Sequence, residues 1–318
     1  ITIEKSDSAG IYGEFSSNSH SMKNSGTINV GNAGSSENKS AGMYGLLTGG
    51  TLNITNENAG NINVNMTKSA GIFAESSTGS NSDLNAENQG TITVNGNESV
   101  GMYGNKSTLK NSKDILVKSD QSTGMFGKND STVTNDATVD VEGDKSAGIY
   151  TQDSNSTNNS AINVKSGESA GMFAKLTTNA TKDYSAVNNG NINLTPSGTQ
   201  NKSVGIYGET ESGVSKVLTL KNEGNATISV DMDNSVGILA KNNVSNGVDK
   251  INVLNDGKIA GSKTKSIGIS ATKSTVTNAA AGEIEMSGDK SAGIYGETES
   301  TITNLGKIKM TNNESAGI

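Results

Sequence analysis

A tetrapeptide of the form Ser-x-Gly-Ile/Met recurs twelve times in this chain of 318 residues, at intervals of 23 to 34 residues. A period of this length is typical of solenoids and other stacked arrays, in which each repeat packs on its two neighbours. We therefore look for function on a long repetitive surface and not in one pocket. The repeated glycines are Gly10, Gly42, Gly71, Gly101, Gly124, Gly148, Gly171, Gly205, Gly237, Gly268, Gly293 and Gly317.

Each repeat contains three short stretches that alternate apolar and polar residues. The first is the motif itself, as in residues 291–296; the second is apolar-x-Asn, as in 133–135; the third is Ile/Val-x-Val/Met, as in 28–30. Alternation with a period of two predicts half-buried strands. Three strands and three turns fit the shortest repeat of 23 residues, whereas left-handed hexapeptide helices have shorter coils. The sequence predicts an all-β, right-handed parallel β-helix of about eleven three-strand coils.

Composition fits an ordered solenoid. Hydrophobic residues make up only 31% of the chain, which alone would suggest disorder, but they occupy fixed positions in every repeat. Pro196 is the only proline, so ladder hydrogen bonds are rarely interrupted. The chain opens and stops within the repeat. We expect residues 1–318 to be a single β-helix segment of a longer array, uncapped at both ends and monomeric.

The charged residues and the missing cysteines exclude several classes of function. The net charge is −7 and all 25 basic residues are Lys, so the basic stripe that a nucleic-acid partner requires is not expected. Without Cys there is no disulfide and no thiolate metal site. No stretch is apolar for 18 residues, so we expect no membrane-spanning segment. The sequence calls for no cofactor and no metal.

Stacking places equivalent residues above one another in columns. We expect the Ala/Val and Ile/Met columns of the first strand to face inward, with four core methionines, and the Ser column to face outward or close a turn. An asparagine ends the second strand of every coil, and stacked Asn side chains can satisfy each other and the turn backbone. This predicts a structural ladder of Asn24, Asn56, Asn88, Asn111, Asn135, Asn158, Asn188, Asn222, Asn255, Asn278 and Asn304.

A third column is aromatic, broken only by Leu239 and Ser270. If the rings share a face with the glycines two residues earlier, they cover bare backbone, as aromatic rescue does in designed sheets. The alternative is an exposed stripe that stacks on sugars or anchors a protein partner. The column consists of Tyr12, Tyr44, Phe73, Tyr103, Phe126, Tyr150, Phe173, Tyr207 and Tyr295.

Lys and Glu residues also occupy equivalent positions in adjacent coils. Lys258, Glu283 and Lys307 share one site before the third strand's Ile, and Glu285 lies 24 residues before Lys309. Opposite signs on adjacent strands favour this register and contribute about 0.2–1 kcal/mol per pair.

Differences in length between repeats indicate where residues are inserted into the coils. The segments between the first and second strands are longer in coils 1–3 and 7–9, at residues 15–20, 46–51, 76–83, 176–184, 210–217 and 242–249. Insertions on one edge of a solenoid either vary in sequence without affecting function or form the binding face. On the second interpretation, the candidate partner-binding residues are Phe15, His20, Leu46, Leu47, Leu176, Tyr184, Val214 and Val244.

The residues of common catalytic sites are missing. His20 is the only histidine and no Gly-x-Ser-x-Gly elbow accompanies it, which argues against serine-hydrolase chemistry. Paired carboxylates could hydrolyse glycosides, but the closest irregular pair, Asp231 and Asp233, has the pattern of solvated turn residues. We therefore expect no enzyme, and keep a glycan hydrolase as the weakest alternative.

The run at residues 289–297, Asp-Lys-Ser-Ala-Gly-Ile-Tyr-Gly-Glu, together with the Gly-x-Ile-x-Met elements, resembles the repeats of the large fusobacterial autotransporter adhesins, the RadD-like family. The resemblance covers all 318 residues and implies a secreted passenger on the outer surface of a bacterium, carried by a C-terminal β-barrel outside this chain. It implies adhesion and virulence, through a host-cell receptor, a surface glycan or a partner bacterium. A passive stalk that presents a distal binding tip is the alternative.

Overall fold

The computed structural model describes residues 1–32, 38–77, 83–196, 198, 201–244 and 250–318. None of these residues belongs to a helix, and hence none to a helix that could cross a membrane. Contacts within the chain divide it into two compact units, Ile1–Asn155 (unit 1) and Ser156–Ile318 (unit 2).

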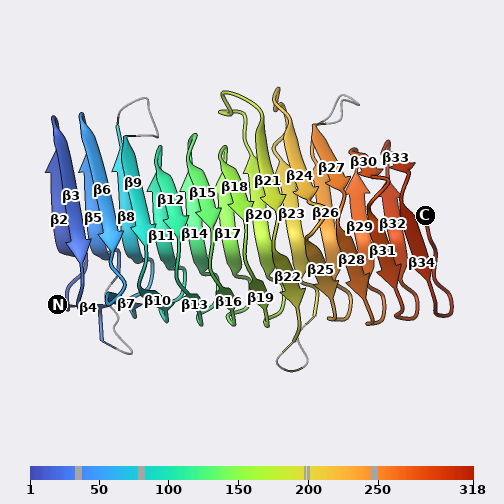
Figure 1. Cartoon of the computed structure of the whole chain (residues 1–318), viewed down its shortest axis with the longest axis horizontal. Coiled ribbons are helices and arrows are strands. Elements are labelled where there is room, and N and C mark those ends of the chain that lie inside the picture. Colours follow the sequence, from blue (N-terminus) through green and yellow to red (C-terminus); the bar gives the residue numbers. More distant parts are fainter. Residues whose placement is uncertain (33–37, 78–82, 197, 199–200, 245–249) are drawn as a thin grey trace. The chain divides into compact units, whose positions relative to one another are not determined.

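Unit 1 is a parallel β-helix in which each strand pairs in parallel with the strand three places later (Figure 1). The strands of the Ser-x-Gly motif form the motif sheet: β2 (Ala9–Phe15), β5 (Ala41–Leu47), β8 (Ala70–Ser76), β11 (Val100–Asn105), β14 (Thr123–Lys128) and β17 (Ala147–Gln152). The second strands are β3 (Ser19–Asn24), β6 (Thr51–Asn56), β9 (Leu84–Asn88), β12 (Thr108–Asn111) and β15 (Thr132–Asn135). The third strands are β1 (Thr2–Ile3), β4 (Thr27–Val30), β7 (Asn61–Val64), β10 (Thr91–Val94), β13 (Ile115–Val117) and β16 (Val139–Val141).

Unit 2 follows the same order. Its motif strands are β20 (Ala170–Leu176), β23 (Val204–Thr210), β26 (Val236–Asn242), β29 (Ile267–Thr272) and β32 (Ala292–Glu297). Its second strands are β18 (Asn155–Asn158), which starts on the last residue of unit 1, β21 (Tyr184–Asn188), β24 (Leu218–Asn222), β27 (Ile251–Asn255), β30 (Thr275–Asn278) and β33 (Thr301–Asn304). Its third strands are β19 (Ile162–Val164), β22 (Asn191–Leu194), β25 (Thr227–Val230), β28 (Lys258–Gly261), β31 (Glu283–Met286) and β34 (Lys307–Met310). The prediction of a β-helix with three-strand coils is confirmed.

The core is built from the inward columns of all three sheets. The third strand contributes two apolar columns, as at Ile28 and Val30, which are fully buried. Burying each such side chain contributes about 1.5–3 kcal/mol, so repetition makes a long apolar interior from a chain of low average hydrophobicity. The expected core methionines are also fully buried: Met43, Met102, Met125 and Met172.

The glycine of the motif faces this core, which corrects the expected alternation of the first strand. A Cβ atom on Gly42 would lie 2.6 Å from the Gly71 carbonyl oxygen and 3.0 Å from Cγ2 of Ile62. The ladder pairs the residues before and after each motif glycine but not the glycines themselves. Both Gly and the following Ile/Met point inward. The preceding Ala/Val column therefore lies on the outer face. The rings and the glycines are on opposite faces, so the hypothesis that rings cover glycine backbone is wrong.

The serine column is buried and closes the turn before the first strand. The backbone N–H of Ser40 donates to Oγ of Ser69 at 3.0 Å, and that of Ser69 donates to Oγ of Ser99 at 3.1 Å. The residue before each serine has a φ of 52 to 64°, a left-handed conformation that turns its side chain toward solvent. These residues are Asp7, Lys39, Lys68, Glu98, Gln121, Lys145, Glu168, Lys202, Asn234, Lys265, Lys290 and Glu314.

The asparagine column forms the ladder that the sequence predicts. The side-chain amide of Asn56 donates to Oδ1 of Asn88 at 2.8 Å, and Asn88 donates to Asn111 at 2.9 Å. The same bond links Asn222 to Asn255 at 2.9 Å in unit 2. These side chains are buried, so the ladder satisfies polar groups that water does not reach.

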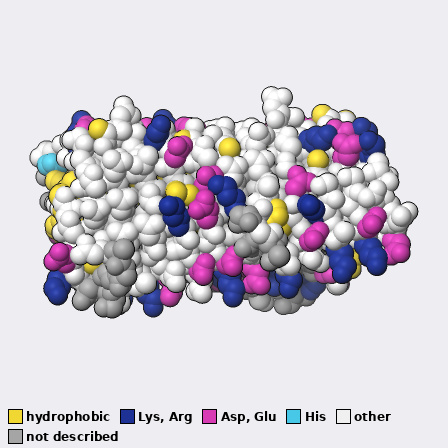
Figure 2. All heavy atoms as spheres, turned by 90° about the horizontal axis from the view of Figure 1, so that it is seen from below, with side chains coloured by type: hydrophobic (Ala, Val, Ile, Leu, Met, Phe, Trp, Pro, Cys, Tyr) yellow, Lys and Arg dark blue, Asp and Glu magenta, His cyan; other side chains and the backbone are white. Residues whose placement is uncertain are grey.

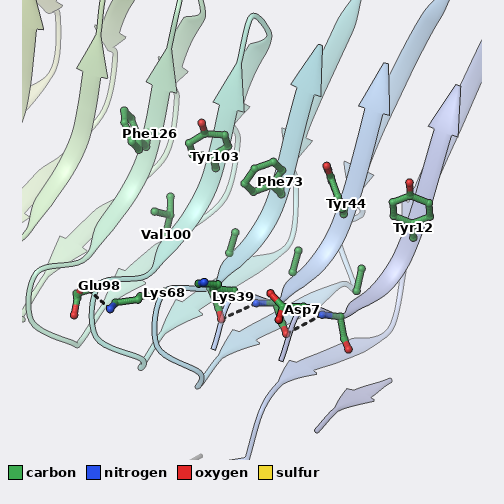
Figure 3. Close-up of a pocket in the computed structure, with 16 residues that line it drawn as sticks. Asp7, Tyr12, Lys39, Tyr44, Lys68, Phe73, Glu98, Val100, Tyr103 and Phe126 are labelled. Carbon is green, nitrogen blue, oxygen red and sulfur yellow. Dashed lines mark hydrogen bonds and ion pairs between the residues drawn. The ribbon is translucent and has the colours of Figure 1, made fainter. Parts of the chain in front are cut away.

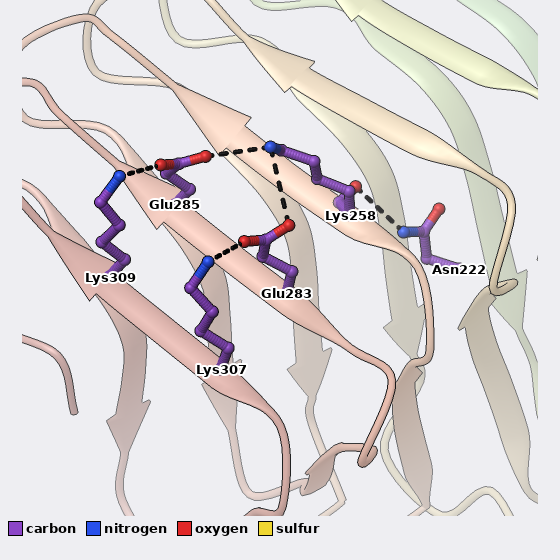
Figure 4. A network of polar contacts seen from close by, with 6 residues as sticks. All are labelled: Asn222, Lys258, Glu283, Glu285, Lys307 and Lys309. Atoms are coloured by element: carbon purple, nitrogen blue, oxygen red, sulfur yellow. Dashed lines mark hydrogen bonds and ion pairs between the residues drawn. The ribbon is translucent and has the colours of Figure 1, made fainter.

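The expected charge register is present in unit 2. Lys258 contacts Glu283 at 3.7 Å and Glu285 at 2.9 Å, while Lys307 pairs with Glu283 and Lys309 with Glu285 at 2.6 Å (Figure 4). The five side chains form one network across β28, β31 and β34.

The longer coils extend their strands and enlarge the core. A short coil has a six-residue first strand and a four-residue second strand, as in β11 and β12, whereas β5 has seven residues and β6 has six. The added residues include Leu47 and Leu52, which are fully buried. Residues at the ends of the insertions therefore extend the strands and add to the core.

Candidate functional site

The predicted partner-binding residues are mostly core residues, which corrects that assignment. Leu47, Leu176, Tyr184, Val214 and Val244 are all at most 7% exposed. They fill the wider interior of the long coils, so they cannot contact a partner on the surface. Alternation missed this because the extra inward column lies beyond the repeated motif.

Phe15 and His20 lie in the same inward columns at coil 1, where Phe15 pairs with Leu47 and His20 with Leu52. Their rings stack at 4.3 Å, and both are half-buried. Nε2 of His20 lies 2.7 Å from the Ser17 carbonyl oxygen. These contacts are those of a core pair.

Leu46 is the one predicted residue that lies on an outward column, beside Glu14 and Glu75 on the neighbouring strands. Parts of the predicted patches, at residues 78–82 and 245–249, lie outside the described residues. The insertions therefore do not assemble a binding face from the residues that were predicted.

A groove lies instead on the outer face of the motif sheet of unit 1 (Figure 3). It encloses about 760 Å³ and runs across the coils from Asp7 to Phe126. The aromatic column forms one wall, the Ala/Val column forms the floor, and the left-handed turn residues form the opposite lip. This volume lies in the usual range of ligand sites, which are largely apolar with a few polar groups.

The size of the floor residue explains where the groove lies. Three successive coils carry alanine at this position, Ala9, Ala41 and Ala70, and the next carries Val100. In unit 2 the same column holds Val204, Val236 and Ile267 after Ala170. A β-branched side chain adds bulk above the floor, so successive alanines leave more room beside the rings.

The aromatic wall is a continuous ladder in unit 1. Adjacent ring centroids are 5.4 Å apart for Tyr12 and Tyr44, 5.0 Å for Tyr44 and Phe73, and 4.4 Å for Phe73 and Tyr103. The first two pairs are edge-to-face and the third is stacked. Each pair contributes about 0.5–1.5 kcal/mol beyond burial, so the wall is stabilised before any ligand arrives.

The lip carries both signs of charge. Lys68 pairs with Glu98 at 3.7 Å, and Lys39 and Asp7 stand on the two preceding coils (Figure 3). Figure 2 shows a face of the molecule on which Lys and acidic side chains are likewise intermixed. The lip therefore presents both ammonium and carboxylate groups beside the groove.

The tyrosine hydroxyls of the wall remain protonated donors. Burial raises the pKa of Tyr44 and Tyr103, and Glu75 adds to both shifts. The Tyr44 hydroxyl donates to Oε2 of Glu75 at 3.5 Å, and that of Tyr12 donates to Glu14 at 3.1 Å. Phenols with raised pKa values supply hydrogen bonds and not nucleophiles.

The two aspartates considered for glycoside hydrolysis accept hydrogen bonds from the neighbouring coil. Oδ1 of Asp231 accepts hydrogen bonds from the backbone and hydroxyl of Ser262, and Oδ1 of Asp233 accepts the same pair from Thr264. Within the described part of the chain, no cluster of three or more His, Cys, Asp or Glu side chains could hold a metal ion. The groove is thus the strongest candidate, and it is shaped for binding.

The chain matches no protein-family model, no curated protein and no solved structure.

Proposed function

We propose that this chain is a segment of a bacterial cell-surface adhesin, the passenger of an autotransporter of the fusobacterial type. On this proposal unit 1 contributes directly to adhesion, because the aromatic groove takes up an extended segment of a molecule on a host cell or a partner bacterium. The groove is the observation that carries the proposal.

Two features support it. Hydrogen bonds of the Ser and Asn ladders link each coil to the next. The side chains of the outer face are therefore held in place by strands and not by loops. Aromatic side chains in a preformed trough provide large contact area at little conformational cost, and tyrosine is enriched among residues that dominate binding energy. The repeat motif at residues 289–297 supports the autotransporter class.

The test fills the groove without changing the coil. Ala41→Ile with Ala70→Ile places β-branched side chains where Ile267 already stands in coil 10. Ala147→Ile is the matched control, since Ala147 belongs to the same column outside the groove lining. Labelled wild-type chain and variants are incubated with cultured epithelial cells and with a panel of bacteria, and bound label is counted.

We expect the double variant to lose at least tenfold in surface binding and the control to retain it. Equal binding by wild type and the double variant would show that the groove is not the binding site. If the wild-type chain binds none of these surfaces, the passive stalk replaces the adhesive segment as the proposed function.

A further inference from the structure

We infer that the groove of unit 1 binds a proline-rich peptide segment in the polyproline II conformation. This inference rests on the proposed function and names the ligand class of the same site. It draws on the repeat distance of the groove, the use of its backbone groups and the orientation of its rings.

The repeat distances of ligand and groove agree. Coils of a parallel β-helix are about 4.8 Å apart, so two coils advance by about 9.6 Å. A polyproline II helix has three residues per turn and a rise of about 3.1 Å, so one turn advances by about 9.3 Å. Successive turns of such a ligand therefore meet successive, equivalent pairs of rings and floor residues. The rings from Tyr12 to Tyr103 thus accommodate roughly one and a half turns, or about five residues.

The backbone N–H groups of the floor are already paired with carbonyl oxygens of the preceding coil. The N–H of Ala41 donates to the Ser8 carbonyl oxygen and that of Ala70 to the Ser40 carbonyl oxygen, each at 2.9 Å, as the parallel ladder requires. An ordinary peptide lying on this apolar floor would lose water from every N–H group that does not reach the carboxylates of Asp7 or Glu98 on the lip. Proline has no N–H group, so a proline-rich segment avoids this loss.

The groove does offer donors for ligand carbonyl groups. The Lys39 ammonium stands on the lip and the Tyr103 hydroxyl on the aromatic wall. Carbonyl groups of a polyproline II helix make no internal hydrogen bonds and are accessible to such donors. Aromatic-lined grooves in unrelated peptide-binding domains exploit the same preformed conformation.

The orientation of one ring pair disfavours a glycan in the middle of the groove. Sugars stack on the open faces of aromatic rings, but Phe73 and Tyr103 stack on each other at 4.4 Å with an angle of 18°. Each therefore covers one face of the other. Aromatic rings and alanine side chains line the groove, and such an apolar surface suits pyrrolidine rings better than hydroxylated ones.

The experiment uses fluorescence anisotropy of fluorescein-labelled decaproline with the 318-residue chain. We expect saturable binding that weakens at least tenfold in Ala41→Ile with Ala70→Ile and is unchanged in Ala147→Ile. Phe73→Leu tests the wall, because Leu239 occupies the same column in coil 9, and we expect at least a threefold loss. Thermal unfolding of each variant verifies that the coil is intact. A labelled Gly-Ser decapeptide should not bind.

Cellohexaose and chitohexaose serve as glycan competitors. Absence of decaproline binding, equal binding by the filled variant, or displacement by either glycan would overturn the inference. If filling the groove abolishes cell binding while decaproline fails to bind, the adhesive groove stands and only the ligand class is wrong. If filling leaves cell binding unchanged, the groove is not the adhesive site, and both the site of the proposed function and its ligand class fail.

Discussion

At the scale of single residues, the motif glycine determines which side chains face out. Because Gly and the next residue both point inward, the strand loses its alternation at this point, and the alanine before the glycine lies at the bottom of the outer groove. Glycine is required by close approach: a Cβ on Gly71 would lie 2.6 Å from the Gly101 carbonyl oxygen and 3.2 Å from Cγ2 of Ile92.

Gly71→Ala is therefore expected to destabilise the chain by about 1–3 kcal/mol, because backbone atoms of the next coil must shift. Gly26→Ala is the control, since a Cβ there meets no atom within 4 Å. Urea unfolding followed by circular dichroism measures the difference. Equal unfolding midpoints for the two variants would contradict the inward placement of the glycine column.

The buried asparagine ladder makes a second prediction at this scale. Asn111→Ala removes the hydrogen bond from the Asn88 amide to residue 111 and the one from residue 111 to Oδ1 of Asn135, and losing such buried bonds costs about 1–3 kcal/mol. Asn95→Ala removes an exposed link to Asn65 and should cost little. The same urea titration compares them, and a similar small loss in both would show that the ladder contributes nothing.

At the scale of elements, the third strands of unit 2 are held in register by charge as well as by core packing. Hydrogen bonds from Lys309 and Lys258 lower the pKa of Glu285 to about 2. A carboxyl with a folded pKa below its unfolded value contributes stability above the unfolded pKa, near 4.3, and loses it as pH falls toward the folded value.

Glu285→Gln should therefore lower the melting temperature at pH 7, with a difference that shrinks as pH falls from about 4.3 toward 2. Thermal unfolding of wild type and variant across this range provides the measurement. Salt at 1 M should also reduce the difference, because these side chains are accessible to solvent. A difference that stays constant from pH 7 to pH 2 would exclude an ionic role for the network.

At the scale of the whole molecule, the sequence predicts the scaffold better than the site. The motif period and the Asn column are sufficient to predict three-strand coils, because each column repeats the same local chemistry. The groove could not be predicted, because its floor depends on Ala41 and Ala70 facing outward, and the broken alternation at glycine hides this. The binding residues were wrongly predicted in the insertions for a related reason. Leu47 and Tyr184 lie outside the repeated motif and were assigned to loops, but they extend the core.

On the proposed function, a run of small floor residues beside the aromatic ladder makes the groove adhesive. The most direct measurement transfers the groove. In the filled background of Ala41→Ile with Ala70→Ile, Val204→Ala with Val236→Ala extends the alanines of this column beyond Ala170, beside Phe173 and Tyr207. Cell-surface binding is then compared among wild type, the filled variant and the transferred variant. We expect binding to be lost on filling and substantially regained on transfer; a filled variant that binds as wild type does would contradict the claim.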